Sequence, residues 1–280
     1  MEKMSHILSY LKIHLKIITF ISDYLILKTD KRLFAFLFNL RSICLFRSPR
    51  LRWKGNYFVI TDKSLPSFSH KIRHQRQCNL TFKFGWEARA ESLGKVYFLE
   101  KINFKDGDIV IDCGANVGDL KLWFEFKNIK IDYVGFEPSP IEFKCLKANV
   151  HPSTVHNVGL WNSDDEIKFY LSSQGADSSL IKPPTYASVA VTKTFRLEGF
   201  LSEPVKCLKL EAEGAEPEVL EGLGDKLQYV EYIAADLGFE RGVSEESTLT
   251  SVTNFLLSNG FELIDISHDR ICALFHNVRT

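Results

Sequence analysis

A glycine-containing turn is the segment of this sequence with the clearest chemical signature. The stretch Asp112-Cys113-Gly114-Ala115-Asn116-Val117-Gly118 follows an apolar run and precedes a helical pattern. Gly114 and Gly118 let the backbone approach a ligand closely in such a turn. Asn116 stands where the dinucleotide motif G-x-G-x-x-G has its second glycine, which disfavours a turn that binds pyrophosphate. The sequence therefore predicts a nucleoside ligand that has no pyrophosphate group.

An acidic residue at the end of the next predicted strand strengthens this prediction. Glu137 lies 25 residues after Asp112, where a carboxylate can accept hydrogen bonds from both ribose hydroxyls. S-adenosylmethionine fits these two requirements, because it is a nucleoside without a pyrophosphate group. We expect Asp112 either to organise the loop or to contact the ammonium group of the cofactor's amino-acid tail. Backbone amides of the loop are expected to bind the carboxylate of that tail. The predicted cofactor-binding residues of these two turns are Asp112, Gly114, Ala115, Asn116, Gly118, Glu137 and Pro138.

The third predicted strand leads into a turn beside the expected adenine. Gly159 makes this turn and is assigned to cofactor binding together with Leu160. Leu160 or Trp161 either stacks on the base or fills the core, and the sequence leaves both alternatives open.

Acidic residues gather after the fourth predicted strand, whose carboxyl end should lie near the transferred methyl group. Methylation of an alcohol needs a base for the hydroxyl proton, and the candidate catalytic residues are Glu211 and Glu213. One alternative is that these acids hold a divalent ion that orients sugar hydroxyls. Another is that Glu216 caps the helix that starts near Pro217 while Glu213 is solvated. No metal-ligand spacing accompanies them, so no metal site is predicted.

A polar segment, 172–179, lies between the third and fourth strands and is expected to cover the acceptor site. Asp177 and Ser178 are the predicted contacts to sugar hydroxyls, with an ordinary exposed loop as the alternative. Asp236, which ends the fifth predicted strand, completes the predicted substrate residues.

Strands and helices alternate from about residue 85 onward, as in a doubly wound parallel sheet. Four residues separate the last two strands, which is too short for a parallel crossover and predicts an antiparallel hairpin. The predicted strands are 109–112, 133–137, 155–158, 207–211, 231–236, 261–266 and 271–276, and the predicted helices are 87–101, 120–126, 141–149, 216–223 and 245–258. We therefore expect an α/β catalytic domain over residues 85–280.

Residues 1–84 are expected to form a basic amphipathic helical extension and linker. Residues 1–54 carry eleven Lys and Arg against three acids. Charges interrupt the apolar run, which argues against a signal peptide and a transmembrane helix. The polar side chains recur at helical spacing, namely Ser9, Lys12, Lys16, Thr19 and Asp23.

The apolar face of this helix either packs on the catalytic domain or in a homodimer, or inserts shallowly at an anionic membrane surface through residues 1–50. We expect a cytoplasmic protein, with peripheral contact at the inner face of the membrane in the second case. A basic cluster at residues 70–76 is read as a solvated helix face or a contact for a phosphate-bearing substrate. It lacks a recognised motif, so no nucleic-acid partner is expected.

Composition agrees with an ordinary soluble domain in a reducing compartment. The chain has 280 residues, of which 45% are apolar and 25% charged. Its six cysteines are scattered without C-x-x-C spacing, which predicts reduced thiols and gives no support for zinc.

The sequence resembles the FkbM-type methyltransferase family from about residue 90 to the end. The matching blocks are DGDIVIDCGANVGD at 106–119, VGFEPSP at 134–140, LKLEAEGAEPEVLEG at 208–222, VEYIAADLGFERG at 230–242 and LFHN at 274–277. The resemblance implies a Rossmann-like class I methyltransferase fold and transfer to a hydroxyl oxygen, commonly of a sugar or polyketide. Asp112, Gly114, Asn116, Gly118 and Glu137 would then bind the cofactor, with Glu211 and Glu213 on the methyl-transfer side. Many members of the family carry Asp where this chain has Glu211.

An S-adenosylmethionine-dependent O-methyltransferase acting on a sugar hydroxyl is therefore the leading hypothesis, with a surface polysaccharide or lipid-linked glycan as the acceptor. The alternatives are a non-catalytic membrane-associated scaffold with the same fold, and an NAD-dependent oxidoreductase. The absence of a glycine at Asn116 and the closing hairpin argue against the oxidoreductase.

Overall fold

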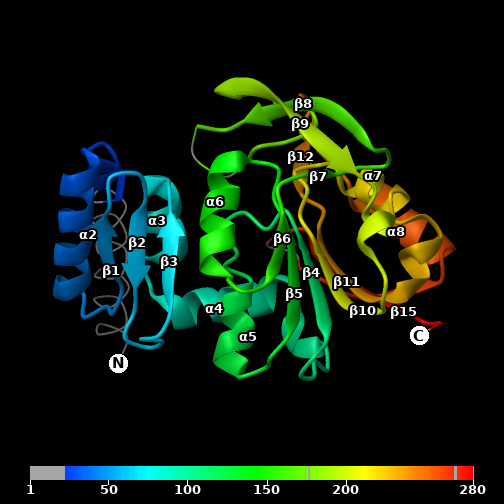
Figure 1. The fold of residues 1–280 in the computed structure, drawn as a ribbon, viewed down its shortest axis with the longest axis horizontal. Coiled ribbons are helices and arrows are strands. Elements are labelled where there is room, and N and C mark those ends of the chain that lie inside the picture. The colour runs from blue at the N-terminus through cyan, green and yellow to red at the C-terminus, as the bar shows by residue number, and fades with distance from the viewer. Residues whose placement is uncertain (1–22, 174, 176, 268–269, 280) are drawn as a thin grey trace, which may run out of the picture.

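The central element of the molecule is a seven-stranded sheet with the order β14-β15-β11-β10-β4-β5-β6 (Figure 1). The computed structural model describes residues 23–173, 175, 177–267 and 270–279. Strand β15 runs antiparallel to both of its neighbours, and the other paired strands are parallel. The strands are β4 (Ile109–Cys113), β5 (Asp132–Phe136), β6 (Thr154–His156), β10 (Val205–Leu210), β11 (Val230–Asp236), β14 (Phe261–Ile266) and β15 (Cys272–Asn277). The predicted Rossmann-like fold with its closing hairpin is confirmed.

Helices cover both faces of this sheet and bury its apolar side chains. Successive strand residues point to opposite faces, so Val110 packs beneath α4–α6 whereas Ile111 packs beneath α7 and α8. The helices are α4 (Trp86–Val96), α5 (Lys121–Lys127), α6 (Pro140–Asn149), α7 (Glu216–Glu221) and α8 (Leu249–Ser258), with short 3-10 helices η1 (Leu99–Lys101), η2 (Leu197–Phe200) and η3 (Gly224–Tyr229). The helix predicted at 245–258 begins only at Leu249, because Glu246–Ser247 is a short strand.

The region before the catalytic domain holds a small antiparallel sheet that the sequence analysis missed. Its strands are β1 (Arg50–Trp53), β2 (Phe58–Thr61) and β3 (Ser69–Ile72), and their buried side chains pack in one cluster with α2 (Lys31–Cys44) and α3 (Gln75–Phe82). The expectation of helices and a linker over residues 1–84 is wrong in this respect. Each strand has four residues, too few to show a clear alternation in the sequence. Most of the predicted amphipathic stripe falls in residues 1–22, outside the described residues.

The basic cluster at residues 70–76 is not one continuous helix face. His70 lies on β3 with its ring buried against Phe82 and Trp86. Burial lowers the pKa of His70 to about 4, so this side chain is neutral near pH 7. Arg76 is exposed on α3. Of the helices in the described part of the chain, none has the length and hydropathy needed to cross a bilayer.

A second small sheet lies between β6 and β10 in the sequence. It consists of β7 (Gly159–Leu160), β8 (Asp165–Leu171) and β9 (Ser188–Phe195), and a two-stranded ribbon of β12 (Phe239–Arg241) and β13 (Glu246–Ser247) follows later. The polar segment 172–179 belongs to the connection between β8 and β9. Strands β8 and β9 were not predicted from the sequence, because their side chains are largely exposed and form no apolar run.

Asn149 at the end of α6 connects the N-terminal sheet to the glycine turn. Its side-chain oxygen accepts the backbone N–H of Lys71 at 2.7 Å. Its amide nitrogen donates to the carbonyls of Lys71 at 3.0 Å and Val117 at 2.8 Å. One buried amide therefore satisfies backbone groups of both β3 and the glycine turn.

Replacing this amide should destabilise the fold. We expect Asn149→Ala to lower the free energy of unfolding by about 1–3 kcal/mol, because it leaves buried backbone groups without partners. The exposed Asn254→Ala on α8 is the matched control and should change stability by less than about 0.5 kcal/mol. Urea unfolding followed by circular dichroism measures both. Equal stability of the two variants would show that the connection contributes nothing.

Candidate active site

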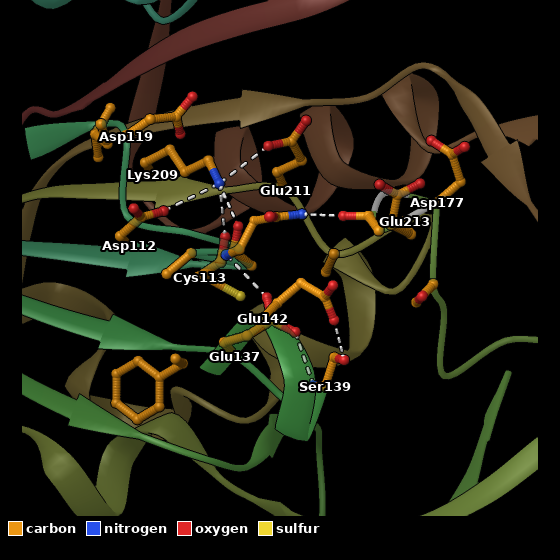
Figure 2. Close-up of a pocket in the computed structure, with 18 of the residues that line it drawn as sticks. Asp112, Cys113, Asp119, Glu137, Ser139, Glu142, Asp177, Lys209, Glu211 and Glu213 are labelled. Atoms are coloured by element: carbon orange, nitrogen blue, oxygen red, sulfur yellow. Dashed lines mark hydrogen bonds and ion pairs between the residues drawn. The ribbon is translucent and has the colours of Figure 1, made fainter. Parts of the chain in front are cut away.

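A cavity of about 330 Å³ opens at the carboxyl ends of β4, β5 and β10 (Figure 2). This volume is within the range of small-molecule sites. The structure brings most of the predicted site residues to its wall, namely Asp112, Gly114, Ala115, Asn116, Glu137, Pro138, Gly159, Leu160, Asp177, Ser178, Glu211 and Glu213. Gly118 and Asp236 are not among the lining residues.

The glycine turn brings the β4 and β10 loops into contact. Gly114 has φ +70°, and a Cβ atom there would lie 1.9 Å from the carbonyl oxygen of Glu211. No other residue fits without moving the β10 loop. Asn116 has φ +47°, a left-handed conformation that asparagine tolerates better than most residues. The turn thus directs the backbone N–H of Asn116 toward Glu137 at 2.8 Å.

Gly118 has a packing function, which corrects its predicted contact with the cofactor. It has φ +81°, and a Cβ atom there would lie 2.5 Å from Val150 Cγ1 and 2.8 Å from Leu146 Cδ1. The glycine lets the end of the turn pass close to the last turn of α6. A glycine is required at this position because any side chain would collide with these two residues.

Glu137 is the best-defined candidate for a nucleoside contact. Its side chain is buried, with the residue 7% exposed, and it accepts the backbone N–H groups of Asn116 at 2.8 Å and Ser139 at 2.7 Å. Burial raises the pKa of Glu137 to about 8, although the two N–H donors oppose the shift. Each oxygen keeps a lone pair that a ribose hydroxyl can fill. These residues therefore fit the ribose of S-adenosylmethionine.

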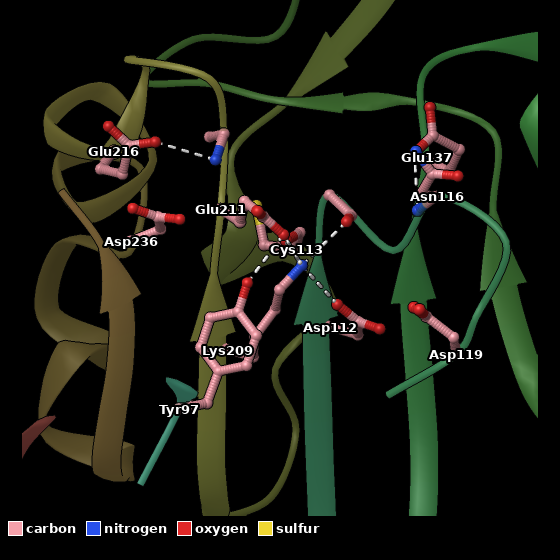
Figure 3. A network of polar contacts seen from close by, with 12 residues as sticks. Tyr97, Asp112, Cys113, Asn116, Asp119, Glu137, Lys209, Glu211, Glu216 and Asp236 are labelled. Carbon is pink, nitrogen blue, oxygen red and sulfur yellow. Dashed lines mark hydrogen bonds and ion pairs between the residues drawn. The ribbon is translucent and has the colours of Figure 1, made fainter. Parts of the chain in front are cut away.

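A buried lysine that the sequence analysis did not single out lies beneath the glycine turn (Figure 3). The Lys209 ammonium is 3.0 Å from both Asp112 Oδ1 and Glu211 Oε2. It also donates to the carbonyl oxygens of Cys113 at 3.1 Å and Gly114 at 2.9 Å. Burial opposes the charge, but the two carboxylates hold the pKa of Lys209 above its usual range. The sequence signal that could have identified Lys209 is a lysine within the otherwise apolar end of the strand Val205–Leu210.

Asp112 organises the turn from below, one of the two functions expected of it. Its carboxylate is paired with Lys209 and accepts the hydroxyl of Tyr133 at 2.7 Å. Burial nevertheless raises the pKa of Asp112. The residue is only 1% exposed, so its contacts are mainly with the protein.

Glu211 is fully engaged by donors, which disfavours its predicted function as a base. It is paired with Lys209 at 3.0 Å and with Arg270, and it accepts the hydroxyl of Tyr97 at 2.8 Å. Burial alone would raise its pKa, but these partners lower the pKa of Glu211 to about 2. A carboxylate with so low a pKa is a weak acceptor of a hydroxyl proton.

Asp236 lies behind Arg270, which corrects its predicted contact with the substrate. Its carboxylate is paired with the Arg270 guanidinium and accepts the backbone N–H of Gly238 at 3.2 Å. The residue is only 1% exposed. Arg270, which lines the cavity, is the group from this pair that a substrate can reach.

The turn after β10 presents Glu213 at the cavity wall. The carboxylate of Glu216 accepts the backbone N–H groups of Ala212 at 2.8 Å and Gly214 at 3.1 Å, and the hydroxyl of Thr248 at 3.0 Å. Glu216 therefore shapes the turn that precedes α7. Glu213 has φ +51°, a conformation that non-glycine residues seldom adopt.

The remaining predicted contacts, Leu160, Asp177 and Ser178, all line the cavity. Leu160 lines the cavity, whereas Trp161 is not among its lining residues. Asp177 also lines it and is paired with Arg76 at 3.5 Å. The Ser178 hydroxyl accepts the backbone N–H of Ser172 at 2.9 Å and so supports its own loop.

The cavity wall carries an excess of acidic groups. Eight of the described lining residues are acids and four are bases. The acids are Asp112, Asp119, Glu137, Glu142, Asp177, Glu211, Glu213 and Glu240, and the bases are Arg76, Arg89, Lys209 and Arg270. The acids that remain ionised can complement the sulfonium charge of S-adenosylmethionine.

Metal ligands do not gather in this region. Within the described ranges, no group of three or more His, Cys, Asp or Glu side chains is arranged to hold a metal ion. All six cysteines are unbonded, and Cys44 is the exposed one.

The Lys209 pair predicts a specific effect on stability. We expect Lys209→Met to lower the free energy of unfolding by about 3–5 kcal/mol, because it leaves Asp112 and Glu211 as buried charges without their cation. Lys206→Met, on the same strand, removes a pair with the more exposed Glu231 and should cost about 1 kcal/mol or less. Chemical denaturation of both variants measures the difference. Similar losses would contradict the importance of the buried pair.

Comparisons with known proteins identify the family of this chain. The family model described as Methyltransferase FkbM domain matches residues 112–263, more than half of the chain. "Methyltransferase 1" of Beauveria bassiana is 27% identical over 169 residues, which are 49% of this chain and 68% of that protein. The 31-O-demethyl-FK506 methyltransferase FkbM of Streptomyces tacrolimicus is 33% identical over 55 residues, which are 20% of this chain and 21% of that protein.

Solved structures show more distant similarity. A SAM dependent methyltransferase from Aquifex aeolicus is 12% identical with a TM-score of 0.40, and the match covers 68% of this chain and 96% of that chain. Nothing about function follows from a match at this level. The family match does establish function at a coarse level: the chain is an S-adenosylmethionine-dependent methyltransferase, and it belongs to the FkbM methyltransferase domain family.

Proposed function

We propose that the chain methylates a hydroxyl oxygen of a sugar, in a surface polysaccharide or a lipid-linked glycan. The observation that carries this proposal is the side chain of Glu213. It lines the cavity two residues after Glu211, whose carbonyl lies against Gly114, and no described residue is its hydrogen-bond or ion-pair partner. A carboxylate at this place without a partner among the described residues is a suitable base for an alcohol, which is too weak a nucleophile while it keeps its proton.

The chemistry assigns separate tasks to the residues of the wall. S-adenosylmethionine supplies an electrophilic methyl group when bound. Glu137 holds the ribose, and Glu213 accepts the hydroxyl proton as the acceptor oxygen forms its new bond to carbon. Burial, together with repulsion from neighbouring carboxylates, raises the pKa of Glu213, so its carboxylate binds a proton more tightly than an ordinary glutamate does.

Two features support an oxygen acceptor that carries several hydroxyls. The name of the Streptomyces relative denotes methylation at an oxygen. On the acceptor side, the wall offers the polar groups of Asp177, Glu240 and Arg270, which suit hydrogen bonding to sugar hydroxyls.

Two substitutions should separate binding from transfer. We expect Glu213→Gln to lower kcat about 10²–10⁴-fold, because the base is lost, while the affinity for S-adenosylhomocysteine is retained. Glu137→Gln is the reciprocal variant, and it should weaken that affinity because one ribose acceptor becomes an amide donor. Calorimetry gives the affinities, and transfer of a radiolabelled methyl group to a panel of sugars and lipid-linked oligosaccharides gives the rates.

The outcomes also decide among the alternatives. Full activity of Glu213→Gln would remove this residue from the chemistry. Wild-type protein that binds the cofactor but methylates no hydroxyl compound would favour the non-catalytic scaffold. Binding of NAD in place of the methionine nucleosides would favour the oxidoreductase, which the family match disfavours.

We also propose that the N-terminal region contacts an anionic membrane surface, at its cytoplasmic face. Helix α2 buries Phe34 and Phe38 against β1–β3, yet it carries a second apolar stripe that is exposed. The stripe has helical spacing and consists of Leu33, Phe36, Leu40 and Ile43, and Phe46 beyond the helix is 98% exposed. The excess of basic residues in 1–54 complements anionic headgroups.

Vesicle sedimentation tests this contact. We expect the full chain to sediment with vesicles that contain phosphatidylglycerol, less so at high salt because the charges are screened. The double variant Phe36→Ser and Ile43→Ser should sediment less, because the stripe loses apolar area. Val189→Ser with Val191→Ser, both exposed on β9, is the matched control and should behave as wild type.

Equal sedimentation of both double variants would contradict the membrane contact, and so would a wild-type chain that never sediments. A change from dimer to monomer in the α2 variant, measured by analytical ultracentrifugation, would instead identify the stripe as an interface between two copies of the chain.

A further inference from the structure

The acids of the cavity wall differ in whether they have partners. Six of the eight receive a hydrogen bond or an ion pair from the protein. They are Asp112, Asp119, Glu137, Glu142, Asp177 and Glu211. The carboxylates of Glu213 and Glu240 line the same cavity, and neither is hydrogen-bonded or ion-paired to any residue that the structure describes. These two groups therefore require another explanation.

Contacts between the residues that follow them in the chain bring Glu213 and Glu240 close to each other. A Cβ atom on Gly214 would lie 2.5 Å from the Cα atom of Arg241, so strand β12 crosses directly over the turn after β10. The Arg241 guanidinium donates to the Gly214 carbonyl and forms a two-point ion pair with Glu218, at 2.9 and 2.6 Å. Glu213 precedes Gly214, and Glu240 precedes Arg241.

We propose that Glu240 forms a proton-sharing pair with Glu213, and that this pair takes the hydroxyl proton of the acceptor. The inference rests on the proposed methyl transfer and adds a second residue to its base. Two carboxylates in one partly buried place cannot both ionise easily, so one proton remains between them. The ionised member is the base, and the protonated member donates its hydrogen bond to that carboxylate.

The surrounding charges agree with this arrangement. Burial and repulsion from Glu240 raise the pKa of Glu213. Burial and repulsion from Asp236 raise the pKa of Glu240, which Arg270 opposes. The charged groups that act on the pair are Glu211 and Glu216 on the β10 turn and its helix, Asp177 in the β8–β9 connection, Asp236 at the end of β11, and Arg270 before β15.

The proton and electron balance of the step is simple. A lone pair of the acceptor oxygen forms the new bond to the methyl carbon, and the acceptor O–H bond breaks with its electron pair staying on oxygen. The proton passes to the ionised carboxylate of the pair. The electrons of the broken sulfur–carbon bond stay on sulfur, which becomes a neutral thioether. The pair then releases one proton to solvent, which restores its singly protonated state.

Carboxyl titration by nuclear magnetic resonance tests the pair without any acceptor. The full chain is labelled with ¹³C at the glutamate carboxyl carbons and titrated with acid and base. Glu213→Gln and Glu240→Gln assign the two signals by their loss. We expect both signals to titrate above the ordinary glutamate pKa of about 4.3, and the Glu213 signal to move to lower pH in Glu240→Gln, because a repelling charge is removed.

Control variants make the result specific. Glu240→Asp keeps the charge and should keep the high titration of Glu213. Glu240→Ala removes the charge without placing an amide in the pair, and it replaces Glu240→Gln if circular dichroism shows that variant to be unfolded. Glu246→Gln, exposed on the neighbouring β13, should leave both titrations unchanged. An unshifted Glu213 titration on loss of the Glu240 charge overturns the pair, as do ordinary titrations of both residues.

Enzyme kinetics gives a second test once a hydroxyl acceptor is found. Glu240→Gln should move the acidic limb of the kcat/KM profile to lower pH by about one unit, because Glu213 then ionises more easily. An unchanged limb contradicts the proposal. If no hydroxyl compound is methylated although the two carboxyl signals titrate as a coupled pair, the proposed function fails while the pair itself stands.

Discussion

The buried ammonium of Lys209 is the interaction on which the rest of the site depends. It lies between Asp112 and Glu211 and binds the carbonyl oxygens of Cys113 and Gly114. One cation thereby joins the glycine turn after β4 to the turn after β10. The two turns also meet where Gly114 passes close to the Glu211 carbonyl. The same ion pairs explain why a carboxylate beside the methyl-transfer region is unsuited to accept a proton.

Glu211 and Glu213 show how environment separates two identical side chains. They are two residues apart, and both line the cavity. Glu211 is surrounded by Lys209, Arg270 and the Tyr97 hydroxyl, and these donors lower its pKa to about 2. Glu213 has acidic neighbours and no cation among the described residues, so its pKa is raised. Such a divergence of environments supports an anchoring function for Glu211 and the acid–base function that we propose for Glu213.

The sequence predicted the central sheet well because its strands are continuous apolar runs bounded by turns. The sequence also placed Asn116 and Glu137 at the cavity, since each belongs to a short turn that directly follows a predicted strand. It missed β1–β3 and β8–β9, whose strands are short or largely exposed. It could not pair Lys209 with Asp112 or Arg270 with Asp236, because contacts between distant segments leave no local pattern. It likewise could not show that Gly118 packs against Val150 while Gly114 faces the cavity.

The central claim is that the turn containing Gly114 and the carboxylate of Glu137 form the site of a methyl donor. Calorimetric titration of the full chain with S-adenosylmethionine, S-adenosylhomocysteine and NAD tests it most directly. The account predicts that both methionine nucleosides bind one per chain and that NAD does not bind. Binding of NAD, or the failure of both methionine nucleosides to bind, would contradict it.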